Sequence, residues 1–231
     1  MKPLRISLVV LCLAARSVAG QATVVDEGSF TITRGGDRIG REDFSIRHVP
    51  TTAGAFETLT RGLVVDGARR LTVDLSADST GLPARYQSKT TGDGAADESY
   101  RAEVLGHRYS ARSVRKSGES ARELLLPNTA LLVEDGVLHL LEFVVARGAG
   151  VVPAVVPSRG VIVRLTVEDA GPDRVAIALQ STPAHKFIVR EGASALVREV
   201  WTDGSGRLLK VSIPSEHVVG IRDDAPRSPS R

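Results

Sequence analysis

Histidine and carboxylate side chains could hold a metal ion or transfer protons, but their spacing in this chain favours neither role. The histidines are scattered, and none belongs to an HxH or HExxH motif. His139 and Glu142 have the i, i+3 spacing that places two ligands on one helix face, yet inside an apolar run such a pair is more often a polar strip than a metal site. The sequence therefore predicts no metal site and no cofactor. The five histidines are His48, His107, His139, His185 and His217.

Serine and acidic residues give no catalytic motif. Gly204-Ser205-Gly206 is flanked by predicted strands on both sides, whereas the serine of a nucleophile elbow stands between a strand and a helix. Adjacent acids such as Asp97 and Glu98 are expected on exposed strand faces, and nothing in the pattern pairs them across a cleft. We predict no catalytic residues. The sequence favours a protein that is not an enzyme, but it does not decide this question.

The elements that must position these side chains are predicted to be strands. Apolar and polar residues alternate along much of the chain, most clearly around Leu71, Val73 and Leu75. This period of two is typical of strands with one buried face. The same alternation places three further sets each on one expected buried face: Tyr100, Ala102 and Val104; Val161, Val163, Leu165 and Val167; and Leu209, Val211 and Ile213.

Glycine-containing turns separate these strands at hairpin spacing. They fall at residues 35–37, 66–67 and 203–206, and further turns are expected at 92–94 and at Ala170 to Asp173. The buried parity of the second strand changes across Gly40, which predicts a bulge there. We therefore predict an all-β fold, a curved antiparallel meander that forms a barrel or half-barrel, with a β-sandwich as the alternative.

One segment departs from the alternation. Residues 137–145 are almost continuously apolar, with Asp135 as a candidate N-cap and Gly148 as a candidate end. The pattern favours one short helix, with Leu138, Leu141 and Val145 on one side, over a fully buried strand, although periodicity alone does not separate the two. In either form the segment is expected in the core or across the opening of the sheet.

Residues 1–20 have the composition of a signal peptide. Lys2 and Arg5 precede a short apolar run, and small residues lead to Gly20, where we expect cleavage, with cleavage after Ala22 as the alternative. The bulky residue before Cys12 does not fit a lipoprotein signal. The mature protein is therefore expected to be periplasmic or secreted, with one β domain over residues 21–222 and a disordered tail over residues 223–231.

Charge argues against a nucleic-acid partner. Three of the 30 Lys and Arg residues lie in the signal peptide, which leaves 27 basic residues against 27 acidic ones. A neutral chain has no overall field that attracts a polyanion. The arginines between residues 101 and 122 locally outnumber the acids, and we interpret them as the solvated face of two strands.

Two hairpins resemble those of uncharacterised exported bacterial β-proteins, a domain of unknown function. The opening segment GSFTITRGGDRIGREDFSI, residues 28–46, has an aromatic strand, a glycine turn and an Ile-Gly step. The last hairpin, from Trp201 to Pro214, is similar to their W-x-D-x-x-G-R-L-L-x-V-x-x-P ending. The resemblance implies a curved antiparallel sheet, loosely similar to the periplasmic carriers of lipoproteins, and it assigns no ligand site.

Three functional hypotheses follow. The first is a non-catalytic protein that binds an apolar or lipid-like ligand in the curved sheet. The second is an envelope assembly or structural factor that pairs with a protein partner through a sheet edge, and the third is a hydrolase with an unrecognised site. We expect a monomer. The sequence is compatible with peripheral contact with a membrane. The candidate ligand-binding residues are Phe30, Phe44, Leu138, Leu141, Phe143 and Trp201.

Overall fold

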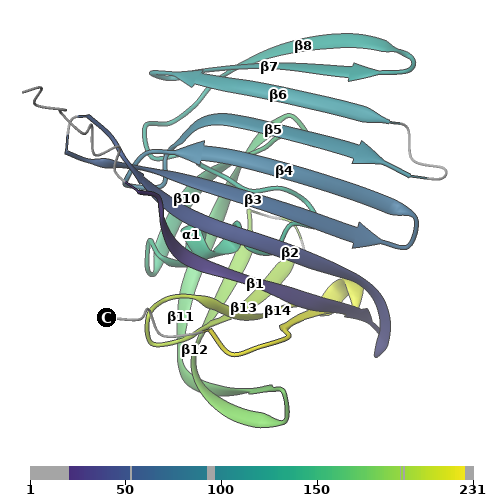
Figure 1. Ribbon diagram of the computed structural model, residues 1–231, viewed down its shortest axis with the longest axis vertical. Coiled ribbons are helices and arrows are strands. Elements are labelled where there is room, and N and C mark those ends of the chain that lie inside the picture. The colour runs from purple at the N-terminus through teal and green to yellow at the C-terminus, as the bar shows by residue number, and fades with distance from the viewer. Residues whose placement is uncertain (1–20, 53, 93–96, 193, 195, 227–231) are drawn as a thin grey trace, which may run out of the picture.

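The computed structural model describes residues 21–226 apart from residues 53, 93–96, 193 and 195, so the predicted signal peptide lies outside it. In the described chain, 15 strands form one sheet in the order β8-β7-β6-β5-β4-β3-β2-β1-β15-β14-β13-β12-β11-β10-β9. The sheet curves around a central space (Figure 1) and stays open between its edge strands β8 and β9. The predicted curved all-β meander is therefore confirmed, in its half-barrel form.

The strands are β1 (Thr23–Arg34), β2 (Asp37–Pro50), β3 (Phe56–Asp66), β4 (Arg69–Ala77), β5 (Pro83–Thr91), β6 (Glu98–Leu105), β7 (Arg108–Arg115), β8 (Gly118–Leu125), β9 (Leu131–Leu132), β10 (Gly150–Val156), β11 (Val161–Ile177), β12 (Gln180–Glu191), β13 (Val197–Thr202), β14 (Leu208–Ile213) and β15 (Val218–Arg222). Helix α1 (Leu141–Val145) and a short 3-10 helix, η1 (Pro214–Glu216), complete the described elements. Neighbouring strands are antiparallel except β9 and β10, which run parallel.

The first and last strands of the chain meet in the middle of the sheet, because β1 pairs with β15. A buried ion pair fixes this junction: the Arg222 guanidinium donates to both carboxylate oxygens of Asp26, at 2.7 and 2.8 Å. Arg222 also donates to the Leu208 carbonyl and lies 5.3 Å from the centre of the Phe44 ring. The two halves of the half-barrel are thus joined by paired charges inside the core.

Three irregularities in strand pairing decide which way side chains face. The register between β1 and β2 shifts beside Gly40, so the predicted bulge is confirmed. The turn expected at Ala170 to Asp173 is wrong: β11 continues through it with a bulge after Asp169, and the chain reverses only after Ile177. A third shift, between Trp201 and Thr202, places Leu209 with Trp201 in a small second cluster, away from Val211. The expectation that Leu209 shares a face with Val211 is therefore wrong.

The concave face of the sheet is filled by the chain itself. We call residues 126–148 the plug segment; it runs from the end of β8 through β9 and α1 to the start of β10. Its apolar side chains are buried against the inward residues of the sheet, among them Leu71, Val73 and Leu75, which are at most 4% exposed. The predicted place of this segment in the core is confirmed. Among the described residues, no helix is long and apolar enough to cross a membrane.

The helix is shorter than the apolar run that predicted it. α1 covers Leu141–Val145, and two turns, at residues 135–136 and 139–140, precede it. Its N-cap is Leu140, which offers no side-chain acceptor, whereas the predicted cap, Asp135, pairs with Arg159 at 3.0 Å. Gly148, with φ of 74°, does follow the helix as expected.

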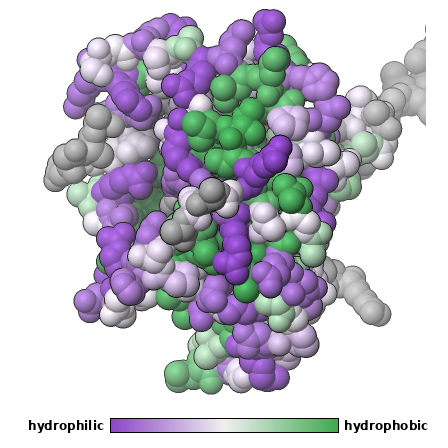
Figure 2. All heavy atoms as spheres, turned by 180° about the vertical axis from the view of Figure 1, so that it is seen from behind, coloured by the Kyte–Doolittle hydropathy of each residue, from purple (hydrophilic) through white to green (hydrophobic). Residues whose placement is uncertain are grey.

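Cover is incomplete at the β6 to β8 end of the sheet. The inward-facing Tyr100, Val104 and Leu124 are only partly buried there. On the outer face, Leu105 and Leu125, which both pair with Arg108, are 76% and 78% exposed. From behind, the upper part of the molecule shows apolar side chains gathered between hydrophilic ones (Figure 2). Three of the five arginines of this region form surface ion pairs, such as Arg108 with Glu123 and Arg115 with Glu98, as expected for a solvated face.

Candidate functional site

A fully buried carboxylate fixes the plug segment to the sheet. Glu42, on β2, is 0% exposed, and it accepts hydrogen bonds from the backbone N–H groups of Leu138 at 2.7 Å and His139 at 3.0 Å. The Nδ1 atom of His139 lies 2.5 Å from the same carboxylate. Glu42 faces inward because it alternates in step with the buried Phe44 and pairs with the buried Phe30 on β1.

The same histidine links the carboxylate to a hydroxyl group. His139 Nε2 lies 3.2 Å from Thr60 Oγ1, and its ring stacks on Phe44 with centroids 5.5 Å apart. The order carboxylate, imidazole, hydroxyl is that of a hydrolase triad. Thr60 and His139 are 3% and 0% exposed, however, so no substrate reaches the hydroxyl in this structure. These bonds therefore anchor the plug segment, and the buried hydroxyl of this set is closed to substrate.

Two further plug carboxylates lie in poorly solvated surroundings. Burial raises the pKa of Glu142 to about 8, with the nearby Asp26 charge adding to the effect, and Glu142 accepts the Leu208 N–H at 3.3 Å. Burial also raises the pKa of Glu134, which accepts the Tyr86 hydroxyl at 2.9 Å. His139 bonds to Glu42, and the predicted pairing of His139 with Glu142 on one helix face does not occur, since His139 precedes α1.

An apolar cavity opens at one end of the half-barrel, beside the plug segment. It measures about 360 Å³ and lies where the β1–β2 and β3–β4 hairpins face residues 133–138 of the plug. We call it the mouth cavity. Its apolar lining comes from Ile32, Ile39, Val64, Val133, Val137, Leu138, Leu141, Leu196, Ile213 and Val218. A concave site of this size with mainly apolar walls is the usual form of a small-molecule pocket.

Charged side chains border the mouth cavity, and one side of this border is held rigidly. Arg159 donates to both oxygens of Glu191, at 2.5 and 2.9 Å, and also pairs with Asp135 at 3.0 Å. Arg198 lies 3.4 Å from Glu191. Arg34 and Arg69 also line the cavity, from β1 and β4, together with the acids Asp66 and Glu216. The cavity thus combines an apolar interior with a charged opening.

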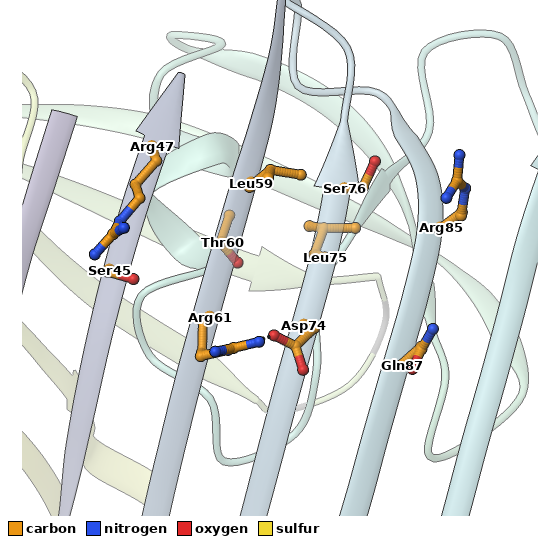
Figure 3. Close-up of a pocket in the computed structure, with 10 residues that line it drawn as sticks. All are labelled: Ser45, Arg47, Leu59, Thr60, Arg61, Asp74, Leu75, Ser76, Arg85 and Gln87. Atoms are coloured by element: carbon orange, nitrogen blue, oxygen red, sulfur yellow. Dashed lines mark hydrogen bonds and ion pairs between the residues drawn. The ribbon is translucent and has the colours of Figure 1, made fainter. Parts of the chain in front are cut away.

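A second hollow lies on the outside of the sheet (Figure 3). It measures about 410 Å³, and Arg47, Arg61 and Arg85 from three different strands border it around the half-exposed Leu59. Arg61 pairs with Asp74 across β3 and β4 at 2.7 Å. Long polar side chains form most of this surface, as on an ordinary solvated sheet face. We therefore place the candidate site at the mouth cavity.

The structure separates the predicted ligand-binding residues. Leu138 and Leu141 line the mouth cavity. Phe30 and Phe44 are buried under the plug segment with ring centroids 5.3 Å apart, and Phe143 packs at the margin of the core. Trp201 belongs to the second cluster, where its indole N–H donates to Asp173 at 2.7 Å.

Sequence reasoning missed the residues that hold the plug segment. Glu42 and Thr60 are not among the predicted site residues, although Glu42 has the parity of the buried Phe44 and Ile46. An acid on the apolar side of a strand was a usable signal. Arg159 and Glu191 meet only through the tertiary fold, 32 residues apart, and no local pattern points to them.

Comparison with known proteins supports the fold. No protein-family model matches the chain, and no curated protein sequence matches it. The crystal structure of a β-barrel-like protein of the domain of unknown function DUF1849 from Brucella abortus is similar over 87% of this chain and 96% of that chain, with a TM-score of 0.57 and 12% identity. The chain is therefore similar in fold to a β-barrel-like bacterial domain.

Proposed function

We propose that the protein is an exported, non-catalytic binding protein that holds a small, mainly apolar ligand in the mouth cavity. The observation that carries the proposal is the apolar lining of this cavity at the open end of the half-barrel. Its volume of about 360 Å³ suits a compact ligand. A long acyl chain along the concave face does not fit, because the plug segment occupies that space.

The chemistry of the opening defines how such a ligand would lie. Its apolar body would contact Val64, Leu138 and Leu141, and any polar end would face the charged border at Arg34 and Arg69. Burying apolar ligand surface contributes about 25 cal/mol per Å², so this interior supplies most of the binding free energy. The charged border supplies orientation.

A neutral fluorescent probe, N-phenyl-1-naphthylamine, tests the proposal. We expect its emission to rise on binding to the mature protein and an Ile39→Trp variant to weaken binding at least tenfold, because the larger side chain fills the cavity. The matched control is Leu59→Trp in the hollow of Figure 3, which should bind the probe as the natural protein does. Absence of binding, or equal binding by the Ile39 variant, would refute the proposed site.

Export is tested separately. We expect the full-length chain, expressed in a Gram-negative host, to be recovered from the periplasm or medium with its N-terminus at residue 21 or 23. Mass spectrometry of the recovered protein measures this directly. An uncleaved chain retained in the cytoplasm would contradict the proposed location and leave the cavity proposal standing.

A further inference from the structure

β8 is a free edge of the sheet. Within the described chain no strand pairs with its outer side, and seven of its eight residues are exposed. Its register with β7 runs without interruption, and it contains neither a bulge nor a proline. Natural sheets commonly protect edges with such features and with charged side chains, and of these β8 has only the charged ones, among them Arg122. Its outer row of backbone donors and acceptors is otherwise open to pairing.

The opposite edge differs. β9 has only two residues, and β10 behind it carries Pro153, whose nitrogen cannot donate a hydrogen bond. The free edge suited to further pairing is therefore β8.

Arg122 of β8 faces inward, because it pairs with the buried Ala111 on β7. Its Nη1 donates to the carbonyl oxygens of Gly160 at 2.7 Å and Arg159 at 3.3 Å, in the turn between β10 and β11. This turn therefore lies over the concave side of β8. A single extended segment that pairs with β8 adds one strand to the sheet, and its inward side chains would lie beside Arg122.

A polar hollow of about 90 Å³ opens at the same place. Three arginines and one acid line it, so its charge is positive, and hydroxyl groups complete the lining. Arg115 is paired with Glu98 and Arg159 with Glu191. The bonds of the Arg122 guanidinium go to carbonyl oxygens. A carboxylate of suitable reach would be a stronger partner for it than these neutral acceptors.

We propose that β8 receives an extended acidic segment of another polypeptide, which adds to the sheet as a strand and places an aspartate or glutamate in this hollow against Arg122. Backbone pairing with β8 gives affinity, and the carboxylate gives selectivity. Residues flanking the acid on the inward side must be small, because the turn at residues 157–160 limits the space. This interaction surface is separate from the mouth cavity, so either proposal can fail without the other.

The probe is a labelled peptide, Ser-Thr-Ser-Val-Asp-Val-Ser-Thr-Ser, with asparagine in place of aspartate as its control. Fluorescence anisotropy should show the aspartate peptide binding about tenfold more tightly than the asparagine peptide. Arg122→Gln should abolish this difference. Arg47→Gln, which removes an arginine from the outer hollow of Figure 3, should preserve it.

Backbone pairing is tested in the peptide, which avoids disturbing the protein. A strand that adds to β8 pairs through one of its two edges, so N-methylation of alternate residues should abolish binding for one register and spare the other. No binding at millimolar peptide, equal affinity of the two peptides, or equal effects of both methylation patterns would overturn the proposal. Sedimentation showing a dimer that Arg122→Gln or bound peptide disrupts would assign the edge to a second copy and refute it as well.

Discussion

Two regions of the sheet carry the same alternation of side chains and have opposite surroundings. On β4 and β5, Val73 and Tyr86 face inward and are each 1% exposed, because the plug segment packs over them. On β7 and β8, Ser113 and Ser120 face inward and bond to each other, and β8 stays exposed. Alternation therefore tells which residues share a face, and a distant segment decides whether that face is covered.

The largest expected effect comes from removing the Glu42 carboxylate, which anchors the plug segment over the covered region of the sheet. Glu42→Ala should lower the free energy of unfolding by about 3–5 kcal/mol, because it leaves two backbone N–H groups and the His139 ring without their buried acceptor. Urea unfolding measures this loss. The matched control is Glu123→Ala on β8, whose exposed pair with Arg108 should contribute less than about 0.5 kcal/mol. Equal losses of stability in the two variants would contradict the distinction between the covered region and the β8 edge.

A leucine pair sharpens the comparison with apolar side chains alone. Leu75→Ala on β4 should cost about 2–4 kcal/mol, since the side chain is 3% exposed and a cavity would remain. Leu124→Ala on β8 should cost less than about 1.5 kcal/mol, because this side chain is only partly buried. Chemical denaturation of both variants gives the two values. A Leu124 loss as large as that of Leu75 would show that the β8 end is covered in solution.

A pH dependence of the plug segment is also expected. The unfolded chain releases the Glu142 proton near the ordinary pKa of 4.5, whereas the folded protein retains it until about pH 8. Between these values the folded state binds more protons, so stability falls as pH rises, by at most about 1.4 kcal/mol per pH unit. Glu142→Gln should reduce this slope and raise the melting temperature more at pH 8 than at pH 5. If the melting temperatures of the natural protein and the Glu142→Gln variant changed with pH in the same way, this effect would be ruled out.

Much of the fold follows from local chemistry. The two glycines at residues 35 and 36, with φ of 61° and 100°, form the tight turn that their sequence predicts. The bulge at Gly40 was visible as a change of parity. The end of β11 was not, because Ala178 and Leu179 form the turn with φ of 46° and 67°, a conformation that neither residue favours. The glycine at 171 instead accommodates a bulge within the strand.

The candidate site was less accessible to prediction. Leu138 and Leu141 could be named from the apolar run, but the mouth cavity also needs Ile32, Val64 and Val218, which lie on three different strands. Trp201 faces away from the main core because it alternates with Val200, whose side chain is buried there. Alternation alone does not say which of these two neighbours faces the core.

The sequence by itself determined the alternating strands, most of the hairpin turns and the presence of one apolar segment that could not be an ordinary strand. These depend on side-chain period and backbone preference, which act between near neighbours. Only the tertiary structure decided that this segment fills the concave face, that Glu42 holds it there, and that β8 stays uncovered. Such outcomes depend on contacts between residues far apart in the chain, such as Glu42 and His139, which no local pattern specifies.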